Sequence, residues 1–292
     1  MAGILERTAF IGFGEAGMAF AEQWGHDAAT AVRAFDIKTD DPFTAEAKRS
    51  DYANFGVAGS ETLAEALGGA DLVISVVTAD QALIAAGQAA AVLRPGTLYC
   101  DFNSVAPQTK QAAAESVEAA GGRYVDVAVM APVRPARLAV PLLVSGPHAT
   151  DACTALREAG FAPRDLGGPI GKGSIIKMLR SIMVKGMEAL TAECFIAAHL
   201  AGVAEEVAAS LNENWPGVDW LEKADYNLDR ILVHGLRRAA EMDEVAATLD
   251  SLEMPNGLTR ATAETQRRIG TLSIPPADGF AGKADAVLGR KR

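Results

Sequence analysis

Three glycines near the N-terminus have the spacing of a phosphate-binding turn. Gly12, Gly14 and Gly17 follow an apolar run and open a helical pattern, in the order G-x-G-x-x-G. The first glycine permits a tight turn, the second lets the backbone approach a pyrophosphate, and the third lets the helix pack closely on the strand. Free N–H groups at the helix start can then bind the anion. We expect the cofactor-binding residues of this turn to be Gly12, Phe13, Gly14, Glu15, Ala16 and Gly17.

An acidic residue follows at the distance expected for the ribose of a dinucleotide. Asp36 ends the second predicted strand, about 20 residues after Gly17, where a carboxylate can accept hydrogen bonds from ribose hydroxyls. The same carboxylate would repel the 2′-phosphate of NADP, and no arginine comes next in the sequence. The sequence therefore favours NAD as the cofactor. NADP stays possible because Lys38 lies close by.

Apolar runs alternate with Ala-rich helical patterns through the first half of the chain. The predicted strands are Thr8 to Phe13, Ala31 to Asp36, Leu72 to Val77, Leu98 to Phe102, Arg123 to Val127 and Leu142 to Ser145. The predicted helices are Glu15 to Trp24, Asp80 to Val92, Pro107 to Ala120 and Ala149 to Ala159. This alternation indicates an α/β fold, with a parallel sheet covered by helices on both faces.

The character of the chain changes after a segment rich in Gly and Pro, Leu166 to Gly173. Beyond it the predicted helices are Ser174 to about Gly202, Glu205 to Asn212, Asp219 to Ala239, Glu241 to Leu252 and Leu258 to Arg268, before an irregular tail from Ile274. We therefore predict a Rossmann-type dinucleotide-binding domain over residues 1–168 and an all-α substrate and dimerisation domain over residues 169–292. A long helix joins the two domains.

The composition argues against several classes of protein. A net charge of −10 is unlike a nucleic-acid-binding protein, because phosphate contacts need clustered Lys and Arg. The apolar runs are far shorter than the roughly 20 residues of a bilayer-spanning helix. The 3 cysteines are scattered, and no Cys or His pair has metal-ligand spacing. We expect a soluble, cytoplasmic protein that binds no metal, nucleic acid or membrane.

A lysine lies near the start of the predicted long helix. Lys177 and Ser181 share one helix face, since they are four residues apart. Position alone leaves two interpretations open, a solvated lysine and a catalytic one. Three motifs in order, however, resemble the β-hydroxyacid dehydrogenases, the family of 3-hydroxyisobutyrate dehydrogenase and phosphogluconate dehydrogenase. The motifs are the glycine-rich turn Ala9 to Gly17, Asp101-Phe-Asn-Ser-Val-Ala-Pro107 and Gly171-x-Gly173-x-x-x-Lys177.

This resemblance implies hydride transfer between a nicotinamide cofactor and a small hydroxylated substrate. Lys177 would be the general acid/base, with the hydroxyl of Ser181 as a second catalytic group. Alcohol oxidation requires a base that removes the hydroxyl proton while hydride leaves carbon. Strand ends bind ligands in open α/β sheets, so Val77, Thr78 and Asn103 are expected at the cofactor and Ser104 at the substrate. The resemblance also implies a homodimer formed through the helical domain.

The substrate loop departs from the family pattern. Met130, Ala131 and Pro132 stand where the family has small residues that bind a carboxylate, and proline has no N–H to donate. Arg180 precedes Ser181 where the family has two asparagines. An imine or non-carboxylate ketone reductase, and a non-catalytic NAD-binding protein, therefore stay open as alternatives. The candidate substrate-binding residues are Ser104, Met130, Ala131, Arg180, His234 and Arg238, although the last two could equally belong to a charged outer helix face.

Overall fold

The structure, a computed structural model, describes residues 2–290. The chain divides into two compact units, Met1–Lys177 and Met178–Arg292, which are described separately below. This division falls later in the chain than the domain boundary predicted after residue 168. It lies within a single long helix, α10 (Lys172–Ala201).

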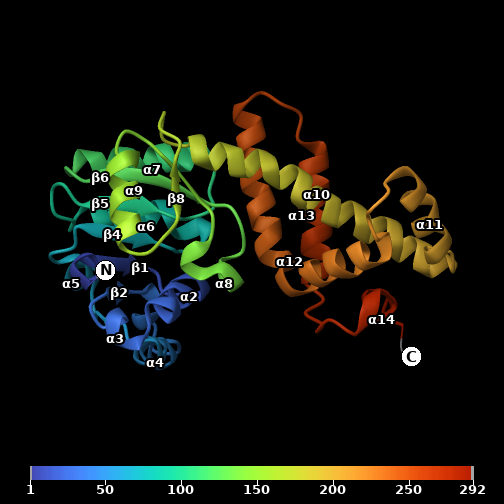
Figure 1. Ribbon diagram of the computed structural model, residues 1–292, viewed down its shortest axis with the longest axis horizontal. Coiled ribbons are helices and arrows are strands. Elements are labelled where there is room, and N and C mark those ends of the chain that lie inside the picture. The colour runs from blue at the N-terminus through green and yellow to red at the C-terminus, as the bar shows by residue number, and fades with distance from the viewer. Residues whose placement is uncertain (1, 291–292) are drawn as a thin grey trace. The chain divides into compact units, whose positions relative to one another are not determined.

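The first unit is built on an eight-stranded, mostly parallel sheet of Rossmann type, as the sequence predicts (Figure 1). The strands are β1 (Thr8–Ile11), β2 (Arg33–Phe35), β3 (Ala58–Gly59), β4 (Leu72–Ser75), β5 (Leu98–Asp101), β6 (Arg123–Val129), β7 (Leu142–Ser145) and β8 (Pro163–Asp165). Their order is β3-β2-β1-β4-β5-β6-β7-β8. The sheet departs from the predicted parallel arrangement at one place, where β6 and β7 pair antiparallel.

The predicted helices of this unit form close to their expected positions. The helices are α1 (Ala2–Leu5), α2 (Glu15–Trp24), α3 (His26–Ala29), α4 (Ala45–Phe55), α5 (Leu63–Leu67), α6 (Ala82–Ala90), α7 (Pro107–Ala119), α8 (Val133–Ala136) and α9 (Ala149–Glu158). Short 3₁₀ turns are η1 (Ile37–Thr39), η2 (Ala79–Gln81) and η3 (Arg137–Ala139). The sequence prediction lacked α1, α3, α4, α5, α8, β3 and β8, which are short or have no strong apolar periodicity.

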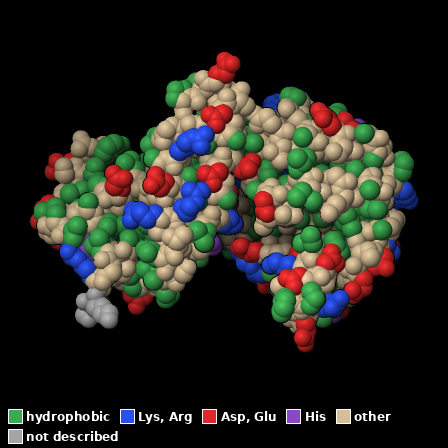
Figure 2. All heavy atoms as spheres, turned by 180° about the vertical axis from the view of Figure 1, so that it is seen from behind, with side chains coloured by type: hydrophobic (Ala, Val, Ile, Leu, Met, Phe, Trp, Pro, Cys, Tyr) green, Lys and Arg blue, Asp and Glu red, His purple; other side chains and the backbone are tan. Residues whose placement is uncertain are grey.

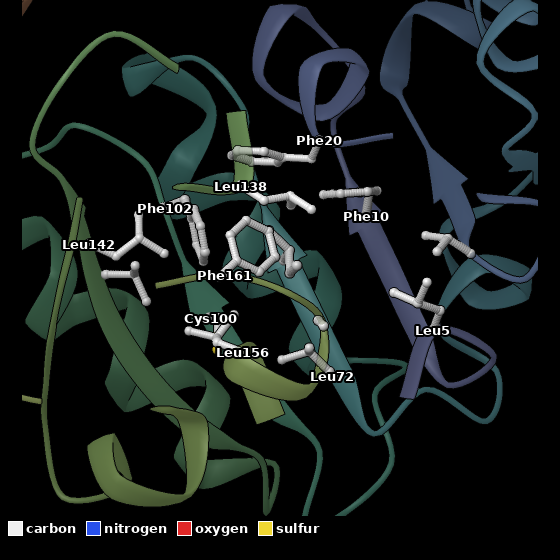
Figure 3. Close-up of a cluster of buried hydrophobic side chains, with 14 of the residues drawn as sticks. Leu5, Phe10, Phe20, Leu72, Cys100, Phe102, Leu138, Leu142, Leu156 and Phe161 are labelled. Carbon is white, nitrogen blue, oxygen red and sulfur yellow. The ribbon is translucent and has the colours of Figure 1, made fainter. Parts of the chain in front are cut away.

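Two clusters of buried side chains cover the two faces of the sheet. One is rich in aromatic rings, and Figure 3 shows Phe10, Phe20, Phe102 and Phe161 pointing toward one another in it. Phe20 meets Phe161 edge to face, with ring centroids 4.9 Å apart, a favoured aromatic geometry. The other cluster gathers alanines of α6 and α7 over the stacked rings of Tyr99 and Tyr124. The Ala-rich patterns in the sequence therefore form helices that lie close to the sheet and to each other.

The second unit is helical. After α10 come α11 (Ala204–Asn214), α12 (Trp220–Ser251), α13 (Gly257–Gly270) and α14 (Gly279–Val287). Two predictions are wrong here. Helix α12 is continuous for 32 residues where two helices were expected, because Met242, Val245 and Ala246 continue its buried face. The tail forms α14 because Phe280 and Ala284 bury themselves in the helical core, which a local pattern does not reveal. Among residues 2–290, no helix is long and apolar enough to cross a membrane.

Candidate active site

The glycine-rich turn follows β1 and leads into α2, as a phosphate-binding turn must. Gly12 has a φ of +81°, and a Cβ built on it would lie 2.7 Å from the carbonyl oxygen of Val76. At Gly17 a Cβ would lie 2.9 Å from the ring of Phe13. The protein's own packing therefore accounts for glycine at both positions.

Gly14 is different, because nothing in the fold requires glycine there. Its φ is −94°, which other residues adopt, and no atom lies within 4 Å of the place where a Cβ would be. The open space lies at the N-terminus of α2, where unpaired N–H groups attract an anion. A side chain would fill the position that a pyrophosphate takes in a dinucleotide fold. These residues fit the cofactor expected from the sequence.

The carboxylate of Asp36 is fixed at the end of β2, beside the turn. Its Oδ2 accepts a hydrogen bond from the backbone N–H of Phe13 at 2.8 Å, and Oδ1 accepts one from Lys38 N–H at 3.0 Å. An ionised carboxylate offers about four acceptor positions. Backbone N–H groups occupy two of these acceptor positions, and the remaining positions can accept hydrogen bonds from ribose hydroxyls.

Two further residues that sequence reasoning missed support this turn. The buried Lys48 donates from Nζ to the carbonyl oxygen of Phe13 at 2.8 Å, and it also pairs with Asp51. The buried ring of Tyr52 packs against Phe13, with centroids 5.4 Å apart. Burial and the negative charge of Asp36 raise the pKa of Tyr52, so that its hydroxyl stays protonated. Both residues lie in the polar helix α4, where no sequence pattern marked them.

A pocket of about 280 Å³ opens where β2 and β3 end. The residues that line it are Thr39, Arg49, Tyr52, Ala53, Val57, Gly59, Ser60 and Glu61. Arg49 is paired with Glu61 through two hydrogen bonds, of 3.2 Å from Nε and 2.7 Å from Nη2. The guanidinium beside this carboxylate lowers the pKa of Glu61, which keeps the pair charged.

The catalytic candidates meet at the ends of β4 and β5. Helix α10 brings Lys177 to the loop after β5, where its Nζ donates to Ser104 Oγ at 2.5 Å. The neighbouring Asn103 braces two strand ends, since its Oδ1 accepts from Val77 N–H at 2.7 Å and its Nδ2 donates to Ser75 at 3.0 Å. Thr78, which follows Val77 in the chain, is exposed just after the end of β4.

A buried cluster of charges beneath these residues was also missed. Lys110 is wholly buried, and its Nζ lies 3.0 Å from Asp101 Oδ1 and 3.4 Å from Asp126 Oδ1. Tyr124 donates its hydroxyl to Asp101 at 2.6 Å. Burial and the negative charge of Asp101 hold the pKa of Tyr124 well above its usual value. A signal for Lys110 exists, because it shares the buried face of α7 with Ala113, Ala114 and Val117.

The other candidate residues belong to the loop after β6 and to the helical unit. Met130 is half-buried after β6, with its N–H bonded to the carbonyl oxygen of Pro141, and Ala131 is exposed. In the helical unit, Arg180 is exposed and the buried Ser181 accepts from Lys185 Nζ at 3.1 Å.

Arg238 and His234 lie on α12. Arg238 is buried and forms a two-bond ion pair with Glu188 of α10, whose Oε2 also accepts from Gln266 at 3.1 Å. Breaking such a pair by removing one partner costs about 3–5 kcal/mol. The guanidinium of Arg238 is therefore engaged in holding helices together. His234, one turn earlier, is half-buried.

Comparison with known proteins gives two family matches. The NAD binding domain of 6-phosphogluconate dehydrogenase matches residues 7–157. A domain of unknown function (DUF1932) matches residues 198–269.

Three solved structures are similar over nearly the whole chain. A conserved hypothetical protein from Sinorhizobium meliloti 1021 is 35% identical, with a TM-score of 0.77 over 99% of this chain and 98% of that one. A conserved protein of unknown function, described as structurally similar to 3-hydroxyacid dehydrogenases, is 30% identical, with a TM-score of 0.68 over 90% and 99% of the two chains. The 3-hydroxyisobutyrate dehydrogenase of Mycobacterium tuberculosis shares the fold at 18% identity, with a TM-score of 0.72 over 97% and 98%.

The chain belongs to the family defined by the NAD-binding domain of 6-phosphogluconate dehydrogenase. Its fold is that of 3-hydroxyisobutyrate dehydrogenases, which confirms the resemblance drawn from the three motifs. Family and neighbouring structures indicate an NAD(P)-binding oxidoreductase that resembles 3-hydroxyacid dehydrogenases.

The open space at Gly14 leads to a first prediction. A Gly14→Ala variant keeps the stability of the wild type to within about 0.5 kcal/mol, because its methyl group meets no protein atom. It binds NADH at least about tenfold more weakly, a loss of roughly 1.4 kcal/mol, because the methyl group obstructs the pyrophosphate. Thermal unfolding and calorimetric titration measure the two effects.

Two other glycines provide the controls. Gly87→Ala adds a methyl group in equally open space within helix α6; it should raise stability by about 0.5–1 kcal/mol, because alanine favours a helix interior over glycine, and leave NADH affinity unchanged. Gly12→Ala lowers the melting temperature, since its positive φ and the contact with Val76 disfavour any side chain. Unchanged NADH affinity in Gly14→Ala would contradict the position given to the pyrophosphate.

Proposed function

We propose that this protein is an NAD-dependent dehydrogenase that acts on the CH–OH group of a small substrate, with Lys177 as general acid/base. The observation that carries the proposal is the 2.5 Å hydrogen bond from Lys177 Nζ to Ser104 Oγ, at the ends of the strands. Such strand ends are the ligand-binding edge of an open α/β sheet.

The residues at this edge divide the chemistry between them. A bound nicotinamide would accept or supply the hydride. Lys177 Nζ takes the hydroxyl proton during oxidation and returns a proton to the oxygen during reduction. Ser104 Oγ orients the amine and offers a hydrogen bond to the substrate oxygen. Ser181 Oγ, one turn after Lys177, acts as a second hydrogen-bonding group in this proposal.

The preference for NAD over NADP rests on charge at the adenosine end. Asp36 supplies acceptors for the ribose hydroxyls and a negative charge that disfavours a 2′-phosphate. The nearby Arg49, which could have bound that phosphate, is paired with Glu61. Both features favour NAD.

The residues of the loop after β6 bear on the class of substrate. Met130, Ala131 and Pro132 give this loop few donors, so a carboxylate is bound less firmly than in enzymes with small polar residues there. This favours a second candidate activity, reduction of an imine or of a ketone without a carboxylate. Arg180, His234 and Arg238 are further substrate candidates from the sequence, although the ion pair of Arg238 with Glu188 argues for a structural role.

The experiment that tests the function has two stages. Calorimetric titration of the purified protein with NADH and NADPH selects the cofactor. A spectrophotometric screen with that cofactor then covers hydroxy acids, polyols, ketones and imines. Turnover of a hydroxy acid or polyol supports the proposal, and turnover of imines alone supports the second candidate. Tight binding without turnover across the panel would indicate a non-catalytic NAD-binding protein.

We also propose that the helical unit forms a homodimer. Helix α10 exposes Leu179, Met183 and Leu190 by 41%, 67% and 62%, on one face by their spacing. Figure 2 shows hydrophobic side chains exposed between charged ones on the face that it presents. Large exposed apolar residues along one helix face are typical of a surface that a second copy covers. Analytical ultracentrifugation should give a dimer for the wild type and a monomer for Met183→Glu, and a monomeric wild type would overturn the proposal.

A further inference from the structure

The buried charge cluster of Lys110, Asp101 and Asp126 contacts every segment that carries a catalytic candidate. It lies at the end of β5 and in the middle of the neighbouring strand β6, and all three side chains are fully buried. Two carboxylates and one ammonium group are costly to bury unless they are paired and hydrogen-bonded. Each of them indeed has several partners in the described part of the chain. Their contacts reach Asn103, directly before Ser104, and Ser174, one turn before Lys177.

Asp126 holds the start of helix α10. Its Oδ1 accepts from Ser174 Oγ at 2.7 Å, and its Oδ2 accepts from Ser174 N–H at 3.1 Å and from Ser145 Oγ at 3.0 Å. Ser145 Oγ in turn accepts from Gly173 N–H at 2.9 Å. A carboxylate at a helix N-terminus also interacts favourably with the helix dipole. Lys177 lies one turn beyond Ser174, so its position depends on this attachment.

Asp101 holds the other side of the catalytic contact. Its Oδ1 accepts from the backbone N–H of Asn103 at 2.8 Å, directly before Ser104. Lys110 Nζ joins the two sides, because it donates to the carbonyl oxygen of Asp101 at 2.7 Å and pairs with both carboxylates. The contacts therefore form a closed ring. From Lys177 it passes through the first turn of α10 to Asp126, and from there through Lys110 to Asp101. The loop of Asn103 and Ser104 then leads back to Lys177.

We infer that Asp126, Lys110 and Asp101 are positioning residues that fix the amine of Lys177 against Ser104. The inference rests on the proposed role of Lys177 and deepens it. The three residues touch no reacting atom, and they act by restricting where Lys177 Nζ and Ser104 Oγ can lie. Small displacements of a catalytic group lower a rate strongly, by about 100-fold for 1 Å.

The test removes one link of the ring without removing a buried charge. Ser174→Ala deletes the hydroxyl that bonds Asp126 and keeps every charge in place. The matched control is Thr97→Val, which deletes an equally buried hydroxyl bond, to Ala70 O, ahead of β5 at the opposite end of that strand. Asp126→Asn is a second variant, and the result from Ser174→Ala stands if Asp126→Asn does not fold.

The first measurement needs neither substrate nor cofactor. The rate of acetylation of Lys177 by acetic anhydride is followed against pH by peptide mass spectrometry, with the exposed Lys38 as an internal reference. We expect Ser174→Ala to change the rate at which Lys177 is acetylated and the pH midpoint of that reaction. Thr97→Val should leave both unchanged, although it lowers the melting temperature by a comparable amount. On a substrate found by the screen, Ser174→Ala lowers kcat about 10- to 100-fold, shifts its pH profile and changes KM little.

The outcomes separate this inference from the proposed function. If Ser174→Ala matches Thr97→Val in both labelling and kcat, the positioning role is wrong, whatever Lys177 does. If Ser174→Ala changes the labelling of Lys177 but Lys177→Met retains full turnover, the positioning role stands and the proposed acid/base role fails.

Discussion

Replacing Lys177 by methionine should lower kcat by about 10²- to 10⁴-fold, the usual contribution of a positioned general acid/base. Methionine keeps the length and apolar stem of the side chain but can neither take nor give a proton. NADH affinity should change little, because the cofactor candidates Gly14 and Asp36 lie on other elements. Steady-state kinetics on the substrate found by the screen, with calorimetry of NADH binding, provides the measurement.

Lys172→Met is the matched control for this variant. Lys172 begins the same helix α10, is exposed, and donates only to a backbone oxygen, that of Leu166, among its recorded hydrogen bonds. Its replacement should leave kcat close to that of the wild type. Full turnover by Lys177→Met would show that another group moves the proton, and the proposed mechanism would then have to be abandoned.

Replacing Asp36 by asparagine should reverse or erase the proposed preference for NADH over NADPH. A hydrogen bond to a charged group is worth about 1 kcal/mol more than one between neutral groups, so two ribose hydroxyls lose roughly 2 kcal/mol, about 30-fold in NADH affinity. NADPH gains, because the carboxylate that repels its 2′-phosphate is removed. Calorimetric titration with both cofactors measures the change in their ratio.

Two features of the chain make this variant interpretable. Asparagine keeps an acceptor for Phe13 N–H, so the turn should stay in place, and it loses only the hydrogen bond from Lys38 N–H to the second oxygen. Asp40→Asn removes the same charge from an exposed position on the same segment and should leave the cofactor ratio unchanged. If both variants behave alike, the preference depends on general charge rather than on Asp36.

The sequence predicted those features that depend on the spacing of residues close together in the chain. Helix α2 has the predicted bounds, Glu15–Trp24, because glycine marks both of its ends. Asn103 and Ser104 were expected at a strand end and Lys177 near the start of the long helix, and in the structure Lys177 reaches Ser104 at that strand end. Their catalytic and binding roles remain predictions.

What the sequence did not reveal depends on tertiary contacts. Lys110 and Arg238 are charged residues on buried helix faces, and each is accommodated by a carboxylate of another element, Asp101 of β5 and Glu188 of α10 respectively. Spacing could have shown that these two residues face inward, but not which partners neutralise them. Helix α14 likewise forms where its aromatic residue Phe280 meets Phe195 of α10.

The antiparallel strand β7 has a consequence for how this enzyme scaffold can vary. A parallel crossover must carry the chain back across the sheet, which constrains its length. Because β6 and β7 run in opposite directions, the segment over residues 130–141 leaves and re-enters the sheet at the same edge. The exposed residues Ala131 and Pro132 of this segment can therefore be exchanged without disturbing any crossover, whereas Leu138 and Val140 are buried in the aromatic-rich cluster and are constrained. Under the proposed function, substitutions at these two exposed positions would change the substrate while leaving the sheet intact.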